Sequence, residues 1–202
     1  MAETIASGER LEIRLSGSGG QGILLAAAII ADAAAGLGKH VVQSQSYGPA
    51  ARGGASKAEV IVSSEEIDYP EVLEPEISLC LSQEAFVEYA AETRPGGLLL
   101  YDSGLADPGE GQRPFALRGL PFTQAATEEL GKKVVANIVA LGALVALGDV
   151  LPAEAVEEST ARRVPAKFRE LNIEALRLGR RLALEAQSAG PQASPLAGVE
   201  ET

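Results

Sequence analysis

The sequence predicts an α/β fold in which one mostly parallel, doubly wound sheet is flanked by helices within a single domain. Short apolar runs alternate along the chain with longer segments of helical periodicity, the pattern of parallel strands joined by helical crossovers. The 202 residues suit one domain with a full core, and no internal repeat divides them. Hydrophobic residues make up 46% of the chain but aromatic residues only 4%, so small aliphatic side chains must build that core.

The strands are predicted from two apolar patterns. Leu11, Ile13 and Leu15 alternate with polar residues, as in a strand with one buried face, whereas residues 77–81 form a continuous apolar run. The predicted strands cover residues 11–15, 41–42, 58–63, 77–81 and 98–101. A polar, glycine-containing loop is predicted over residues 43–56.

The first predicted helix is apolar on nearly all sides and is therefore expected to be buried. Its Ala-rich segment ends at Gly36 and Gly38, which are typical helix terminators. The predicted helices cover residues 23–37, 84–93, 134–147, 153–163 and 166–187. We therefore expect one domain over residues 10–187, with residues 1–9 and 188–202 as flexible tails.

Charge and composition exclude several classes of protein. The net charge of −11 argues against a nucleic-acid partner, because phosphate binding normally needs a basic surface. The longest apolar stretch, residues 22–35, contains Asp32 and is too short for a bilayer core of about 30 Å. Residues 1–10 lack the apolar centre of a signal sequence. We expect a soluble, cytoplasmic protein that binds neither nucleic acid nor a membrane.

The first predicted strand is followed by a glycine-rich turn that opens the first helix. Glycines let the backbone turn sharply and approach a phosphate, and the helix N-terminus offers free N–H groups. This context favours a Rossmann-like pyrophosphate site. A tight turn that packs the helix on the strand without a ligand is the alternative. The turn consists of Gly17, Ser18, Gly19, Gly20, Gln21 and Gly22.

The charges that follow this turn bear on the kind of ligand. A nicotinamide dinucleotide site usually places an acidic residue about 20 residues beyond the turn, and residues 33–58 contain none. His40, Arg52 and Lys57 lie there instead, which favours a phosphorylated ribose. NADP stays open as a ligand, whereas NAD is disfavoured. A P-loop is disfavoured because two apolar residues, rather than Lys and Ser or Thr, follow Gly22.

A second glycine-containing loop, residues 46–56, follows the second predicted strand. Arg52 supplies a planar, permanently charged group for phosphate or carboxylate, and Gly53 and Gly54 allow close backbone approach. A surface loop with a solvated Arg52 is the alternative. Both glycine-rich loops are expected to open onto the crevice at the carboxyl ends of the strands.

Several motifs in order along residues 10–187 resemble the gamma subunit of 2-oxoacid:ferredoxin oxidoreductases. The Tyr-Gly-Pro form of the second motif resembles the branch that acts on 2-oxoglutarate or on 2-oxoacids in general. The motifs are Gly17-Ser-Gly-Gly-Gln-Gly22, Tyr47-Gly-Pro-Ala-Ala-Arg-Gly-Gly54, Ile67-Asp-Tyr-Pro70, Tyr101-Asp-Ser103, Asn137-Ile-Val-Ala-Leu-Gly142 and Phe168-Arg-Glu-Leu-Asn172.

The resemblance implies a role inside a larger enzyme. The family oxidatively decarboxylates a 2-oxoacid with coenzyme A, giving an acyl-CoA, carbon dioxide and reduced ferredoxin. Thiamine diphosphate lies between the alpha and beta components with its magnesium ion, and the iron–sulfur clusters lie on beta or delta components. The gamma component helps to hold coenzyme A and completes the assembly. The single Cys agrees with this division, since a self-contained cluster needs about four.

The same resemblance implies ligand contacts for this chain, which is not expected to be catalytic alone. Residues 18–21 within the turn from Gly17 to Gly22 become candidate contacts of the coenzyme A pyrophosphate. Arg52, Gly53 and Gly54 become candidate contacts of coenzyme A or of a neighbouring subunit. An independent NADP-dependent oxidoreductase and a scaffold subunit without ligand contact are the alternatives.

Four further sites have more ordinary interpretations. Cys80 lies in an apolar strand and is expected to be an inert core residue. Asp102 ends a strand and is expected to form a turn. Asn137 lies within an apolar helix and must find a hydrogen bond if it is buried. A cluster of three arginines should face outward, as a solvated surface or an interface with another subunit: Arg177, Arg180 and Arg181.

Overall fold

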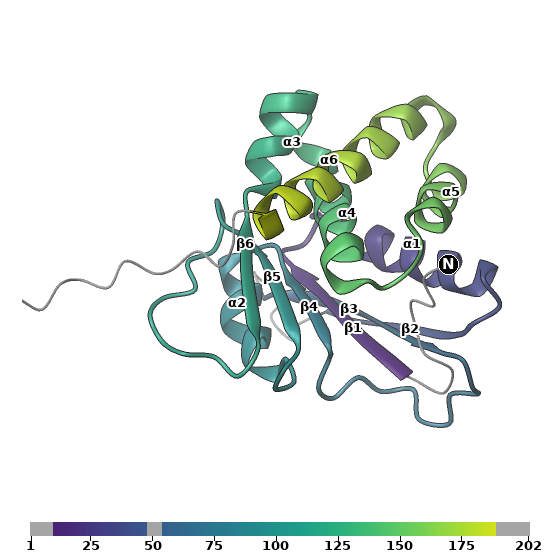
Figure 1. The fold of residues 1–202 in the computed structure, drawn as a ribbon, viewed down its shortest axis with the longest axis vertical. Helices are drawn as coiled ribbons and strands as arrows, with labels where there is room; N and C mark the ends of the chain where they lie inside the picture. The colour runs from purple at the N-terminus through teal and green to yellow at the C-terminus, as the bar shows by residue number, and fades with distance from the viewer. Residues whose placement is uncertain (1–9, 48–53, 189–202) are drawn as a thin grey trace, which may run out of the picture.

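The computed structural model describes residues 10–47 and 54–188, which form a six-stranded sheet with helices on both faces (Figure 1). The strand order is β2-β3-β1-β4-β5-β6. β3 runs antiparallel to both of its neighbours, and the other strands share one direction, so the predicted mostly parallel α/β fold is confirmed. The strands are β1 (Arg10–Gly17), β2 (His40–Tyr47), β3 (Ser56–Ser63), β4 (Ile77–Cys80), β5 (Leu98–Asp102) and β6 (Ala116–Leu120).

The helices divide unequally between the two faces of the sheet (Figure 1). α1, α3, α4, α5 and α6 share the main hydrophobic core with one face, whereas α2 packs in a smaller cluster on the other. The helices are α1 (Ile23–Gly36), α2 (Gln83–Tyr89), α3 (Phe122–Leu130), α4 (Ala136–Gly148), α5 (Ala153–Arg163) and α6 (Arg169–Ser188). Short 3-10 turns precede or follow them at Ala90–Glu92 (η1), Lys133–Val135 (η2) and Ala166–Phe168 (η3).

The structure corrects the sequence prediction at three places. β6 and α3 were not predicted, because β6 is a partly exposed edge strand and α3 is short. β2 extends to Tyr47 and β3 begins at Ser56, so the predicted loop over residues 43–56 is wrong for its first five residues and for its last. β2 lies at an edge of the sheet, so it needs only backbone pairing with β3, which polar side chains allow. α6 includes Ser188, which the prediction placed in a tail; the rest of both predicted tails lies outside the described residues.

α4 is the central helix of the main core, and α6 crosses it at backbone contact. A Cβ atom on Gly142 of α4 would lie 2.1 Å from the Leu176 carbonyl oxygen, well inside van der Waals contact. A Cβ atom on Gly179 of α6 would lie 1.8 Å from the Val139 oxygen. Glycine at both positions therefore sets how closely the two helices approach.

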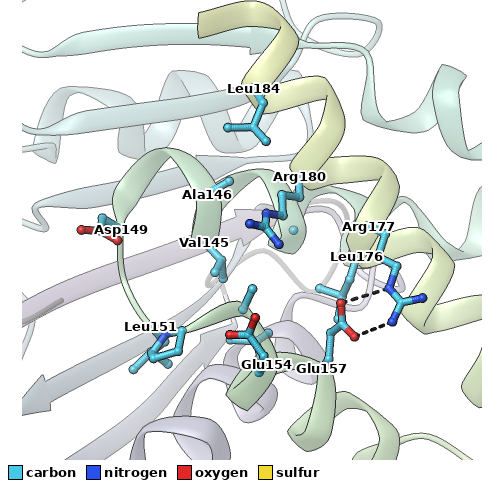
Figure 2. Close-up of a pocket in the computed structure, with 14 residues that line it drawn as sticks. Val145, Ala146, Asp149, Leu151, Glu154, Glu157, Leu176, Arg177, Arg180 and Leu184 are labelled. Atoms are coloured by element: carbon cyan, nitrogen blue, oxygen red, sulfur yellow. Dashed lines mark hydrogen bonds and ion pairs between the residues drawn. The ribbon is translucent and has the colours of Figure 1, made fainter. Parts of the chain in front are cut away.

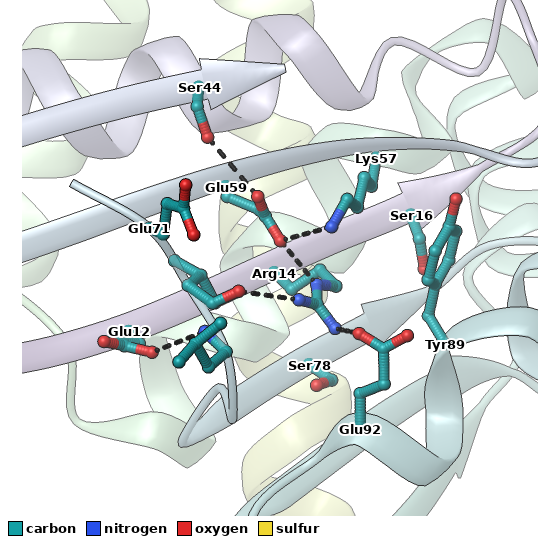
Figure 3. A network of polar contacts seen from close by, with 12 residues as sticks. Glu12, Arg14, Ser16, Ser44, Lys57, Glu59, Glu71, Ser78, Tyr89 and Glu92 are labelled. Carbon is teal, nitrogen blue, oxygen red and sulfur yellow. Dashed lines mark hydrogen bonds and ion pairs between the residues drawn. The ribbon is translucent and has the colours of Figure 1, made fainter. Parts of the chain in front are cut away.

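The opposite face of β1 and β3 carries a buried charged network (Figure 3). Arg14 is only 2% exposed and donates hydrogen bonds to Glu59 Oε1 at 2.7 Å and to the Val72 carbonyl at 3.1 Å. It also pairs with Glu92, and Lys57 Nζ reaches Glu59 Oε1 at 3.0 Å. The charges compensate one another, which is the condition for burying them.

Within the described residues, no helix is long and apolar enough to cross a membrane.

Candidate functional site

The carboxyl ends of β1 and β4 lie side by side at the point where the chain changes direction across the sheet. β1 leads into α1 on one face, and β4 leads into α2 on the other. Such a switch point is where open α/β sheets bind their ligands. The glycine-rich turn from Gly17 to Gly22 lies there, as the sequence predicted.

The turn is held from inside by Gln21. Its Oε1 accepts the Ser18 amide at 2.6 Å, and its Nε2 donates to the Leu81 carbonyl at 2.7 Å. Gly17 is buried at the end of β1, where a Cβ atom would lie 2.5 Å from Gln21 Oε1. Gly17, the Ser18 amide and the Gln21 side chain therefore shape the turn, and the exposed part of it is Gly19 and Gly20.

The end of the turn offers backbone N–H groups to the crevice. Gly20 and Gly22 have φ of +87° and +73°, a conformation that L side chains rarely adopt. The first intrahelical hydrogen bonds of α1 run from the Leu25 and Ala26 amides to the Gly22 carbonyl. The amides that precede them at the helix N-terminus therefore make no intrahelical hydrogen bond. An anion near these groups is favoured by their partial positive charge.

Asn137 ties α4 to this turn. Its side chain is 5% exposed, and its Nδ2 donates to the Gly22 carbonyl at 3.0 Å. The predicted requirement for a hydrogen bond at buried Asn137 is therefore confirmed. A Cβ atom on Gly22 would lie 2.4 Å from Nδ2, so this contact also requires glycine.

A pocket of about 150 Å³ lies beside the turn, between β4, α3 and α4. Lys133 in η2 is exposed and is the cation among the lining residues. Lys133 was not predicted, because only the fold brings η2 to the glycine-rich turn. The adjacent Lys132-Lys133 pair before an apolar helix was the available signal. The lining residues are Gly20, Gln21, Leu81, Thr123, Lys133, Val134, Ala136 and Asn137.

The pocket's size limits what this chain can hold alone. Small-molecule sites usually measure about 300–1,000 Å³, so 150 Å³ suits a phosphate group rather than a whole nucleotide cofactor. Val134 lines the same pocket and is 78% exposed, which leaves an apolar surface beside the cation.

The second predicted loop connects β2 to β3 beside the carboxyl end of β1. Ser56, at the start of β3, pairs with Gly17 on one side and with Tyr47 on the other. The described ends of the second loop therefore lie beside the start of the glycine-rich turn. Gly54 is the first described residue after the loop, whereas Arg52 and Gly53 lie outside the described residues.

Asp102 and Cys80 serve the fold. Asp102 is fully buried, and its carboxylate accepts the Gly104 amide at 3.0 Å and the Thr123 amide at 2.9 Å, so it forms a turn and caps α3. Cys80 is 1% exposed, and burial raises the pKa of its thiol to about 11. Both agree with the prediction.

Within residues 10–47 and 54–188, no three His, Cys, Asp or Glu side chains gather as metal ligands.

Comparisons with known proteins agree on one family. The model for pyruvate ferredoxin/flavodoxin oxidoreductase matches residues 12–182. The chain is 45% identical over 178 residues to the 2-oxoglutarate synthase subunit KorC of Methanocaldococcus jannaschii, covering 87% of this chain and 95% of that one.

Two solved structures share the fold. The gamma subunit of a keto/oxoacid ferredoxin oxidoreductase from Geobacter sulfurreducens PCA is 46% identical, with a TM-score of 0.78 over 88% of this chain and 98% of that one. The 2-oxoglutarate:ferredoxin oxidoreductase from Magnetococcus marinus, which has 2-oxoglutarate, coenzyme A and succinyl-CoA bound, is 26% identical, with a TM-score of 0.79. That match covers 96% of this chain and 34% of the other.

Proposed function

This chain belongs to the pyruvate ferredoxin/flavodoxin oxidoreductase family as a gamma-type subunit of a 2-oxoacid:ferredoxin oxidoreductase, and on that premise we propose that its glycine-rich turn helps to hold coenzyme A. The proposed reaction is the oxidative decarboxylation of 2-oxoglutarate to succinyl-CoA with reduction of ferredoxin. The names of two curated relatives and of one solved structure support this substrate.

The observation that carries the proposal is the position of Lys133 beside the exposed Gly20 at the switch point of the sheet. Coenzyme A carries a pyrophosphate and a phosphorylated ribose, and an ammonium group with backbone amides suits these anions. The chain has a net charge of −11, so a pocket with a cation and no acidic lining residue stands out from the rest of its surface.

The proposed site is shared. A pocket of about 150 Å³ holds only part of coenzyme A, and the rest would lie against partner subunits. We propose alpha and beta subunits, with or without a delta subunit, as these partners. Thiamine diphosphate, magnesium and the iron–sulfur clusters would be bound there, and this chain would supply binding and assembly rather than a reacting group.

The test is the coenzyme A dependence of the assembled enzyme with Lys133→Gln. Loss of one charge-assisted contact costs about 1.5–3 kcal/mol, so the KM for coenzyme A should rise about tenfold or more. The KM for 2-oxoglutarate and kcat at saturating coenzyme A should stay unchanged. Lys39→Gln is the matched control, because Lys39 precedes the amino end of β2, whereas the site lies at the carboxyl ends of β1 and β4.

A second pair of variants separates charge from loop shape. Gln21→Met removes both hydrogen bonds of the Gln21 side chain. Gln21→Glu keeps an acceptor for the Ser18 amide, loses the donor to the Leu81 carbonyl and places a carboxylate beside the proposed phosphate site. We expect the larger increase in the KM for coenzyme A from Gln21→Glu. Equal effects, together with an unchanged KM in Lys133→Gln, would support the scaffold alternative. Tight NADP binding by the wild-type chain would support the NADP-dependent alternative.

A further inference from the structure

A groove lies between α4, α5 and α6, with a cavity of about 390 Å³ (Figure 2). Its floor is apolar and is formed by Val145 and Ala146 of α4, Val156 of α5 and Leu176 of α6. Leu184 lies at the rim and is 46% exposed. The groove lies along the later turns of α4, whereas the glycine-rich turn contacts the first turn of that helix.

The helix packing makes this groove permanent. Gly142 and Gly179 fix the crossing of α4 and α6 at backbone contact, so the two helices cannot slide together to close the space beside it. Figure 2 shows that an ion pair between Arg177 and Glu157, with a shortest N–O distance of 2.8 Å, joins α6 to α5 at one end. The groove is therefore preformed before any partner binds.

The groove has one cationic wall. Figure 2 shows Arg180 reaching from α6 over the pocket toward α4. Its two neighbours in the cluster form ion pairs, Arg177 with Glu157 and Arg181 with Glu129. Arg180 forms no ion pair among the described residues; after the hydrogen bond from Arg177, its charge contributes to lowering the pKa of the Glu157 carboxyl. Asp149 and Glu154 lie on the opposite side of the pocket.

We propose that this groove docks a segment of another subunit of the same enzyme, with an apolar side chain on the floor and a carboxylate on Arg180. The Arg180 guanidinium forms no ion pair among the described residues and favours an acidic residue, whereas the carboxylates of Asp149 and Glu154 repel one, so the acidic side chain must face α6. The apolar floor provides the burial that anchors an interface. A second copy of this chain fits less well, because each copy carries a net charge of −11.

The first test is assembly of the co-expressed complex with groove variants. Arg180→Glu should weaken association with the partner subunits at least tenfold, and Ala146→Phe should do the same by filling the floor. Arg118→Glu is the matched control, because Arg118 is exposed on β6, outside the groove. Assembly of both groove variants with wild-type affinity would overturn the proposal. The readout is association, so it is separate from the KM for coenzyme A.

The second test places a cross-linker in the groove. Cys80 is the single cysteine and is buried, so Ala153→Cys introduces one reactive thiol at the groove wall. A cysteine-directed benzophenone should cross-link the assembled complex to one partner subunit, in a peptide where an apolar residue adjoins Asp or Glu. Gln124→Cys on α3 should not give that product. A cross-link to a second copy of this chain, or to no subunit, would refute the assignment.

Discussion

Gly179 of α6 lies directly against the carbonyl group of Val139 of α4, at a separation that excludes even one additional carbon atom. A Cβ atom there would lie 1.8 Å from the carbonyl oxygen, and the reciprocal contact of Gly142 with Leu176 is similarly close. Backbone atoms of a buried helix cannot move aside as a flexible side chain can. This pair of contacts therefore determines the position of α6 on the domain.

Gly179→Ala should consequently destabilise the fold. Overpacking a well-packed site costs about 1–3 kcal/mol and occasionally more, and we expect the upper end of that range here because the obstacle is backbone. The measurement is urea unfolding of the purified chain. Gly36→Ala is the control, since the one atom near its Cβ is a side-chain nitrogen of Arg162 at 4.0 Å. It should leave stability unchanged or slightly raised.

Arg14→Met should destabilise the chain through the charges that it leaves behind. Removing one partner of a buried ion pair costs about 3–5 kcal/mol, because the remaining charge loses its compensation. Glu59 would keep Lys57 but lose the 2.7 Å contact with Arg14. The same substitution at Arg181, whose ion pair with Glu129 is exposed, should be nearly neutral in the same unfolding assay. Similar losses for both variants would contradict this account.

Asp32→Asn should change how stability depends on acid. The hydrogen bond from Arg162, followed by that from Ser159, lowers the pKa of the Asp32 carboxyl below its usual value. A lowered folded-state pKa stabilises the fold above the unfolded pKa, about 3.9, and this contribution is lost as pH falls through the folded pKa. The stability difference between wild type and Asp32→Asn should therefore shrink below about pH 4. Urea unfolding at several pH values measures it, with Glu110→Gln, at an exposed carboxylate, as control.

Cys80 should resist alkylation in the folded protein. Burial raises the pKa of its thiol to about 11, from an ordinary value of 9.0, so the reactive thiolate is about a hundredfold scarcer at neutral pH. Iodoacetamide at pH 8 should label the native protein far more slowly than the protein in urea. Rapid labelling of native protein would mean that β4 opens to solvent more readily than its complete burial indicates.

The sequence was sufficient for the parts of the fold with strong periodicity. The alternation in β1, the apolar run of β4 and the all-round apolar helix α1 were predicted because burial selects those patterns directly. β6 was missed because an edge strand buries little side-chain surface. The polar residues of β2 were assigned to a loop for the same reason.

The candidate site was predicted only in part, because its residues come from distant segments. The glycine-rich turn was visible as a local motif, but its internal clamp by Gln21 depends on the Leu81 carbonyl of β4. Lys133 joins the site only when α3 and α4 pack beside β4. No local pattern encodes such a meeting, so sequence reasoning named the glycines and missed the cation.

The hydrogen bond from Asn137 to the Gly22 carbonyl spans 115 residues of sequence. Closing a loop of that length costs conformational entropy, so this contact cannot form from local structure alone. On the ribosome, the turn is synthesised before α4, and it cannot reach its final shape until α4 has emerged. Chains truncated before residue 137 would carry the complete glycine motif and still lack the working geometry.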